Sequence, residues 1–174
     1  MATKLDHLRT LARVCRQFGG RLTVLSQSTF DNLVEQAFDS ADDRIGDGLN
    51  MAPFTDAHAL HWRKKVIYVV RGREQVGSII HEMGHVFAAP HNPEHICREC
   101  REWDWLGWEI ALARQIGAAQ VWSRHNANYH TGEGGGGQWN KLSTKRRRAV
   151  VADRLTRARK IGVVDADGAP RSVR

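Results

Sequence analysis

Long apolar runs are absent from this sequence of 174 residues. No stretch approaches the ~18 consecutive apolar residues that a helix needs to cross a bilayer, so we expect no membrane-spanning segment. The first residues, MATKLDHLRTLARVCRQ, also lack the apolar segment of a secretory signal. These two absences predict a cytoplasmic protein.

Cysteine is scarce as well, with three residues in the whole chain. An odd number argues against the paired disulfide framework of a small secreted protein. Cys97 and Cys100 form a C-x-x-C pair, whereas Cys15 stands far from them. The pair leaves metal binding or redox chemistry open.

A net positive charge is missing from most of the chain and is concentrated at its end. Residues 1–140 carry 15 lysines and arginines against 16 acidic residues, a net charge of −1. Residues 141–174 carry 11 against three aspartates, a net of +8. A terminal segment of this kind can contact nucleic acid or another polyanion, and we place the candidate contact at residues 145–160.

The length and the mixed periodicity predict a single α+β domain over residues 1–162, followed by a flexible tail at 163–174. We expect it to be mainly helical, with a small β-sheet whose edge strand is KKVIYVV at residues 64–70. Residues 39–57, rich in Asp and Gly, are predicted to form a loop. A second short strand is expected at 21–25, and the helices at about 3–18, 28–38, 73–89, 102–124 and 143–161.

The predicted helix after that strand contains the motif His81-Glu82-Met83-Gly84-His85, which has the form H-E-x-x-H. Residues at positions i and i+4 lie on one face of a helix, so the two imidazoles can bind one tetrahedral zinc ion. Glu82 is then placed to act as the general base toward a zinc-bound water, whose pKa the metal lowers to about 7.

The motif and the strand before it resemble the zincin metallopeptidases, which implies a third protein ligand for the metal. Glu109, on the next predicted helix, corresponds to the third ligand of a gluzincin-like site. The layout over roughly residues 64–116 is similar to ImmA/IrrE-type metallopeptidases, and the segment EWDWLGWEIALA to small phage proteins with H-E-x-x-H. These resemblances imply a bacterial or phage-infected host cell.

His91 is the alternative third ligand, because HEMGHVFAAPH places three histidines at the spacing of the metzincin motif. Two features depart from that motif. Ala88 stands where metzincins have a glycine, and no methionine follows Met83 to form their methionine turn. These departures favour Glu109 as the third ligand, with His91 as the alternative.

The loop after the motif contains a second group of potential ligands. His91, His95, Cys97 and Cys100 have the pattern H-x₃-H-x-C-x₂-C, and such residues can close a structural zinc site. We therefore expect one catalytic zinc, with a second, structural zinc as a candidate. If His91 binds the catalytic metal, the second site loses a ligand.

These features predict a zinc-dependent metallopeptidase that hydrolyses a protein or peptide substrate, with Glu82 as general base. His125 and Tyr129, in the loop after the Glu109 helix, are candidate donors for the oxyanion. Two alternatives remain. One is a metal-binding, zincin-like interaction module that contacts nucleic acid through its basic C-terminal helix, and the other is a zinc hydrolase with a non-peptide substrate.

Overall fold

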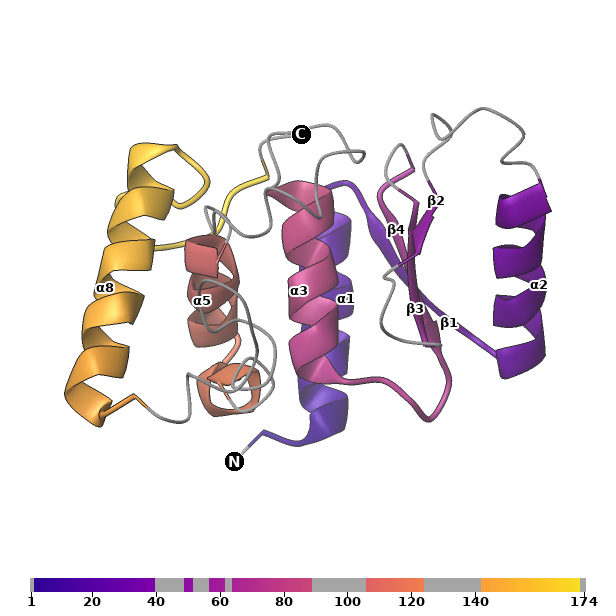
Figure 1. The fold of residues 1–174 in the computed structure, drawn as a ribbon, viewed down its shortest axis with the longest axis horizontal. Helices are drawn as coiled ribbons and strands as arrows, with labels where there is room; N and C mark the ends of the chain where they lie inside the picture. The colour runs from indigo at the N-terminus through magenta and orange to yellow at the C-terminus, as the bar shows by residue number, and fades with distance from the viewer. Residues whose placement is uncertain are drawn as a thin grey trace.

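The computed structural model describes residues 2–39, 49–51, 57–61, 64–88, 106–123 and 142–172. The predicted α+β class is confirmed: helices cover both faces of one small mixed sheet. The elements follow one another along the long axis of the molecule (Figure 1). The order is helix α2, the sheet, the helix pair α1 and α3, then α5, and finally α8 at the far end.

The sheet has four strands in the order β1-β4-β3-β2. β1 runs parallel to β4, with Arg21 opposite Val66, whereas the other two pairings are antiparallel. The strands are β1 (Arg21–Leu25), β2 (Leu49–Met51), β3 (His58–His61) and β4 (Val66–Val70).

The prediction that the strand before the motif helix forms the edge of the sheet is wrong, because β4 lies between β1 and β3. Four of its five residues are buried, with Tyr68 half-buried. A continuous apolar run of this kind is typical of a strand covered on both faces. The loop predicted at 39–57 is also wrong in part, since it contains β2.

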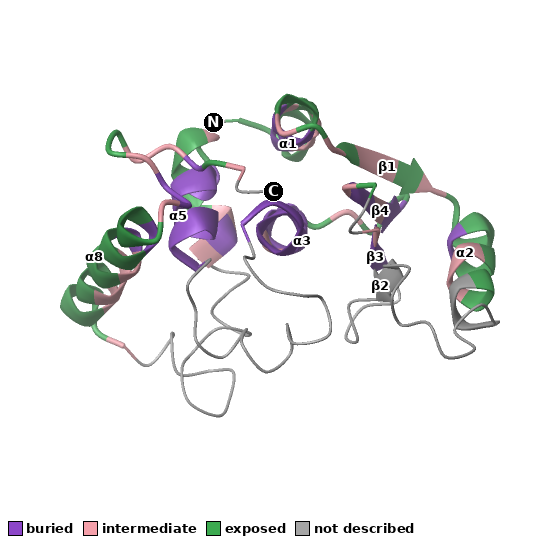
Figure 2. Cartoon of the chain, turned by 90° about the horizontal axis from the view of Figure 1, so that it is seen from above, coloured by how far each residue is buried: buried purple, intermediate pink, exposed green. Residues whose placement is uncertain are grey.

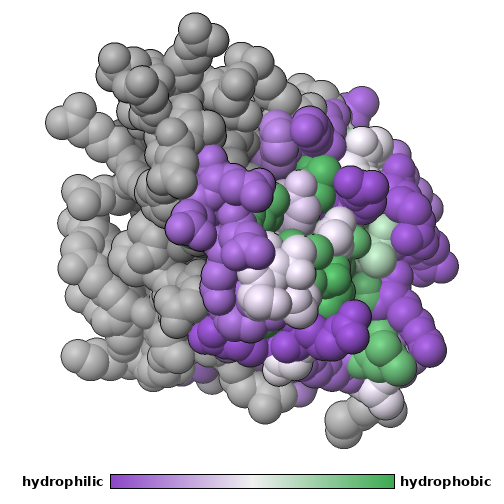
Figure 3. Space-filling view, turned by 90° about the vertical axis from the view of Figure 1, so that its right-hand side faces the viewer, coloured by the Kyte–Doolittle hydropathy of each residue, from purple (hydrophilic) through white to green (hydrophobic). Residues whose placement is uncertain are grey.

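Helices α1 (Lys4–Gln17) and α3 (Val76–Phe87) cover one face of the sheet, and α2 (Gln27–Asp39) covers the other (Figure 2). A small core lies under α2, where Phe30 packs with Ala59 and Val70. The larger core lies between the sheet and the remaining helices. Seen from the α2 side, polar side chains surround a small group of apolar ones at the surface (Figure 3).

Beyond α3 lie α5 (Leu106–Gln115) and α8 (Thr144–Lys160). The helix predicted to continue to residue 124 is interrupted, because Gly117 adopts a φ of 71°. The chain turns there and continues as a short helical segment at 119–123. A positive φ suits glycine and ends helices, so this one glycine accounts for the interruption of the predicted helix. No helix among the described residues is long and apolar enough to cross a membrane.

The C-terminal segment is not a free tail over its described part, residues 163–172. Val163 and Val164 are buried against the core, and Val164 pairs with Pro170. The carbonyl oxygen of Arg171 accepts a hydrogen bond of 2.8 Å from Trp108 Nε1. The prediction of a flexible tail there is wrong because these valines complete the core beside α5.

Gly107 permits the close approach of α5 to α8. A Cβ atom at this position would lie 2.3 Å from the carbonyl oxygen of Arg154 and 2.5 Å from Cβ of Ala158. Alanine normally stabilises a helix interior by about 0.5–1 kcal/mol relative to glycine. Here we expect Gly107→Ala to lower the free energy of unfolding by about 1–3 kcal/mol, because the backbone of α8 must move.

Urea denaturation followed by circular dichroism measures this change. The control is Ala152→Ser, at an exposed position on α8, which we expect to stay within about 0.5 kcal/mol of the wild type. A Gly107→Ala protein as stable as the wild type would contradict the close packing of the two helices.

Candidate metal centre

The H-E-x-x-H motif lies on α3, which the chain enters directly from β4 through a turn at Gly72. Eleven of the twelve residues of α3 are buried, and His81 is the one that is half-buried. Ile79, Ile80, Met83 and Phe87 pack into the larger core. The packing therefore fixes the rotation of α3 and sets the positions from which His81, Glu82 and His85 project.

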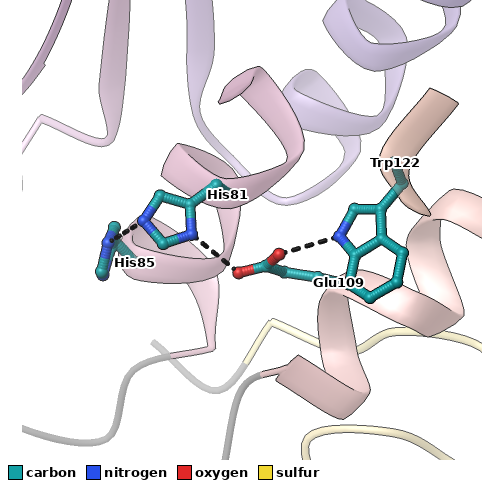
Figure 4. Close-up of polar contacts among 4 residues, drawn as sticks. All are labelled: His81, His85, Glu109 and Trp122. Atoms are coloured by element: carbon teal, nitrogen blue, oxygen red, sulfur yellow. Dashed lines mark hydrogen bonds and ion pairs between the residues drawn. The ribbon is translucent and has the colours of Figure 1, made fainter. Parts of the chain in front are cut away.

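The rings of His81 and His85 meet through their Nε2 atoms, which lie 2.8 Å apart (Figure 4). The two rings are nearly perpendicular, at 83°, and their centroids are 4.3 Å apart. A tetrahedral zinc ion at about 2.0–2.1 Å from two nitrogens holds them roughly 3.3 Å apart. The pair therefore fits zinc after a shift of a few tenths of an ångström in the side chains.

Glu109 reaches this pair from α5, and its side chain is fully buried. One oxygen, Oε1, lies 2.9 Å from Nδ1 of His81. The other, Oε2, accepts a hydrogen bond of 2.9 Å from Nε1 of Trp122. A buried carboxylate is costly unless its oxygens are paired, and both are paired here. The structure thus brings Glu109 to the histidines, on the side of His81 that faces away from His85 (Figure 4).

Trp122 is the member of this group that sequence reasoning did not find. It follows Glu109 by 13 residues and lies in the short helical segment after Gly117. Residue spacing does not place it beside Glu109, because the turn at Gly117 decides where the segment packs. The buried carboxylate on α5 was the available signal, since it required a donor from elsewhere.

The charges of this cluster shift the pKa values of two of its members. Burial acts to lower the pKa of His81, but the carboxylates of Glu109 and Glu82 outweigh it and raise this pKa to about 9. Burial raises the pKa of Glu82 to about 7, although the charge of His81 acts in the opposite direction. A carboxyl group with a pKa near neutrality can both accept and release a proton under physiological conditions.

Several predicted site residues lie outside the described residues. These are the alternative third ligand His91, the candidate structural ligands His95, Cys97 and Cys100, and the candidate oxyanion donors His125 and Tyr129. Within the described part of the chain, no group of three or more His, Cys, Asp or Glu side chains could hold a metal ion. The ligand role of Glu109 and that of His91 both stay predictions.

Comparison with known proteins adds no relative, since no protein-family model, curated protein or solved structure matches this chain. The residues of the site themselves are therefore the basis for inferring its function.

Proposed function

We propose that this protein is a zinc-dependent metallopeptidase of the zincin type, with His81 and His85 as metal ligands and Glu82 as general base. The observation that carries the proposal is the convergence of the two Nε2 atoms at 2.8 Å on one face of α3. Side-chain nitrogens arranged in this way suit a tetrahedral zinc ion. Bound zinc would supply Lewis-acid activation of a water molecule and of the substrate carbonyl.

The chain's own residues supply the proton transfer. The Glu82 carboxylate accepts the proton that the attacking water loses, and it then gives this proton to the nitrogen of the leaving amine. Burial supports both steps, because it raises the pKa of Glu82 to about 7. No hydrogen bond to the Glu82 side chain occurs within the described residues, so its carboxylate is not committed to a structural partner there.

Metal content is the direct test of this function. We expect the dialysed protein to retain about one zinc per chain and His85→Ala to lose it, because one imidazole cannot hold the ion alone. His7→Ala is the matched control, since His7 is a buried histidine on α1. Atomic emission spectroscopy measures the zinc-to-protein ratio.

A zinc that His85→Ala and His81→Ala both retain in full would contradict the proposed site. A second zinc that survives His85→Ala would instead indicate the candidate structural site at Cys97 and Cys100.

The surface of α8 favours a second candidate function, contact with nucleic acid. Leu155 and Ala158 turn toward the core, whereas six of the eight lysines and arginines of α8 are exposed and Asp153 is its single acidic residue. Lysines and arginines on one exposed surface can neutralise successive phosphates. The exposed cations are Lys145, Arg146, Arg148, Arg157, Arg159 and Lys160.

We expect the protein to bind a DNA duplex with a strong dependence on salt. If about four phosphates are contacted, the slope of log K against log salt is about −3.6. The triple variant Arg146→Glu, Arg148→Glu, Arg157→Glu should remove most of this slope. The triple variant Arg9→Glu, Arg13→Glu, Arg16→Glu, at exposed positions on α1, is the charge-matched control. Fluorescence anisotropy at several salt concentrations measures binding, and equal slopes for both variants would exclude α8 as the contact.

A further inference from the structure

A continuous series of side-chain contacts connects three separate parts of the chain at the candidate metal centre (Figure 4). Trp122 Nε1 donates to Glu109 Oε2 at 2.9 Å, Glu109 Oε1 lies 2.9 Å from His81 Nδ1, and His81 Nε2 lies 2.8 Å from His85 Nε2. The series begins in the segment after Gly117, passes through α5 and ends on α3. Each ring nitrogen of His81 therefore has a different neighbour.

The two nitrogens of an imidazole point in different directions, so the nitrogen that Glu109 contacts determines whether Glu109 can also bind the metal. The Nε2 atoms of His81 and His85 face each other and define the place for a shared metal. Oε1 of Glu109 is bonded to Nδ1, on the other side of the ring. An oxygen in hydrogen-bond contact with Nδ1 is too far from a metal at Nε2 to be its ligand. This geometry matches a carboxylate that orients a metal-binding histidine through its second nitrogen.

Trp122 limits the orientation of the carboxylate itself. An indole N–H can only donate, and its bond to Oε2 leaves Oε1 facing His81. Both Trp122 and Glu109 are buried, so water does not compete for these contacts. The tryptophan therefore acts on His81 through Glu109.

We propose that Glu109 and Trp122 are positioning residues, which hold a proton on Nδ1 of His81 and keep its Nε2 unprotonated, as metal binding at that atom would require. Glu109 is then not the third ligand. The effect on metal binding rests on the proposed function, whereas the effect on the His81 tautomer does not. His91, the predicted alternative third ligand, lies outside the described residues.

The test variant is Glu109→Gln, because the indole N–H of Trp122 determines which way the new amide group points. Trp122 can only donate, so it selects the amide oxygen as its partner and turns the amide NH₂ toward Nδ1 of His81. That donor moves the ring proton to Nε2, the atom that must bind the metal. We expect zinc affinity to fall about 10–100-fold while the stoichiometry stays at one.

Trp122→Phe and the double variant separate positioning from ligation. Trp122→Phe alone should weaken zinc binding less than Glu109→Gln does. In the double variant the amide is free to turn its oxygen toward Nδ1, so part of the lost affinity should return. Trp108→Phe is the matched control, because it removes an indole donor whose partner is the Arg171 carbonyl. It should leave zinc affinity unchanged.

Zinc affinity is measured by competition with a chromogenic chelator. The His81 tautomer is measured by ¹⁵N NMR of the metal-free protein at a pH above 9, because the pKa of about 9 leaves both ring nitrogens of His81 protonated at neutral pH. Loss of stoichiometric binding in Glu109→Gln without recovery in the double variant would overturn the proposal and make Glu109 a ligand. Identical His81 ¹⁵N shifts in the wild type and Glu109→Gln would also overturn it. If the wild type binds no zinc, the proposed function fails, and the NMR comparison still decides whether Glu109 positions His81.

Discussion

Glu82→Gln is expected to reduce peptide hydrolysis about 10²–10⁴-fold while zinc binding remains. The amide has the size of the carboxylate but cannot accept the proton of the attacking water, and general-base catalysis contributes about that factor. Zinc affinity should change little, because Glu82 is not among the proposed ligands. The measurement is the cleavage of a fluorogenic peptide library, with zinc content determined on the same samples.

The matched control for this variant is Glu74→Gln. Glu74 precedes α3 and pairs with Lys4 at 3.3 Å, at the surface. It should retain the wild-type rate. A Glu82→Gln enzyme with full activity and full zinc content would contradict the proposed mechanism.

The same variant has a consequence for stability that needs no substrate. The pKa of Glu82 is raised to about 7 in the folded protein from an ordinary value of 4.5. The ionised carboxylate is therefore more stable in the unfolded chain than in the folded protein. Below pH 4.5 the group is protonated in both states and costs nothing. Between pH 4.5 and 7 the unfolded chain gives up this proton while the folded wild type keeps it, so the wild type loses stability over that range and the loss is complete above pH 7. Glu82→Gln has no such proton and shows no such loss.

We therefore expect metal-free Glu82→Gln to be more stable than the metal-free wild type at pH 8. The two should converge near pH 4.5. Denaturation in urea at several pH values measures the difference, and a gap that grows toward low pH would contradict the sign of the shift.

Trp108→Ala is expected to cause the largest loss of stability. Its side chain is fully buried on α5 and packs against Phe18, with the ring centroids 6.1 Å apart. Its indole also donates to the carbonyl of Arg171 and so connects α5 to the C-terminal segment. Truncating a buried tryptophan to alanine costs about 3–5 kcal/mol, a large share of the ~5–15 kcal/mol by which a domain is usually stable.

Denaturation in urea, followed by circular dichroism, measures the loss for Trp108→Ala. Leu5→Ala is the control, because Leu5 on α1 is 53% exposed and we expect it to cost under about 1 kcal/mol. A Trp108→Ala protein within 1 kcal/mol of the wild type would show that the α5 contacts contribute little.

The sequence alone determined the features that depend on local periodicity. The amphipathic pattern predicted α1, α2 and α8 to within a few residues, and the continuous apolar run predicted β4. The spacing of four residues placed His81 and His85 on one face of α3, which follows from helix geometry. Glu109 was also expected beside the histidines, because the resemblance to gluzincin-like sites implied a carboxylate from the next helix.

The tertiary structure decided what depends on contacts between distant segments. Strand order is of this kind: nothing within residues 66–70 says that β1 and β3 pair on either side of them. The packing of Val163 and Val164 is another case, because two valines near a chain end reveal no partner until α5 is in place.

At the candidate metal centre, too, some features follow from the sequence and others only from the tertiary structure. The sequence contains the two histidines and the candidate general base, but which nitrogen of His81 faces Glu109 depends on the separation and rotation of α3 and α5. Trp122 joins the group only because the turn at Gly117 directs residues 119–123 back against α5. The distinction between a metal ligand and a positioning residue therefore comes from packing between helices, which residue spacing does not encode.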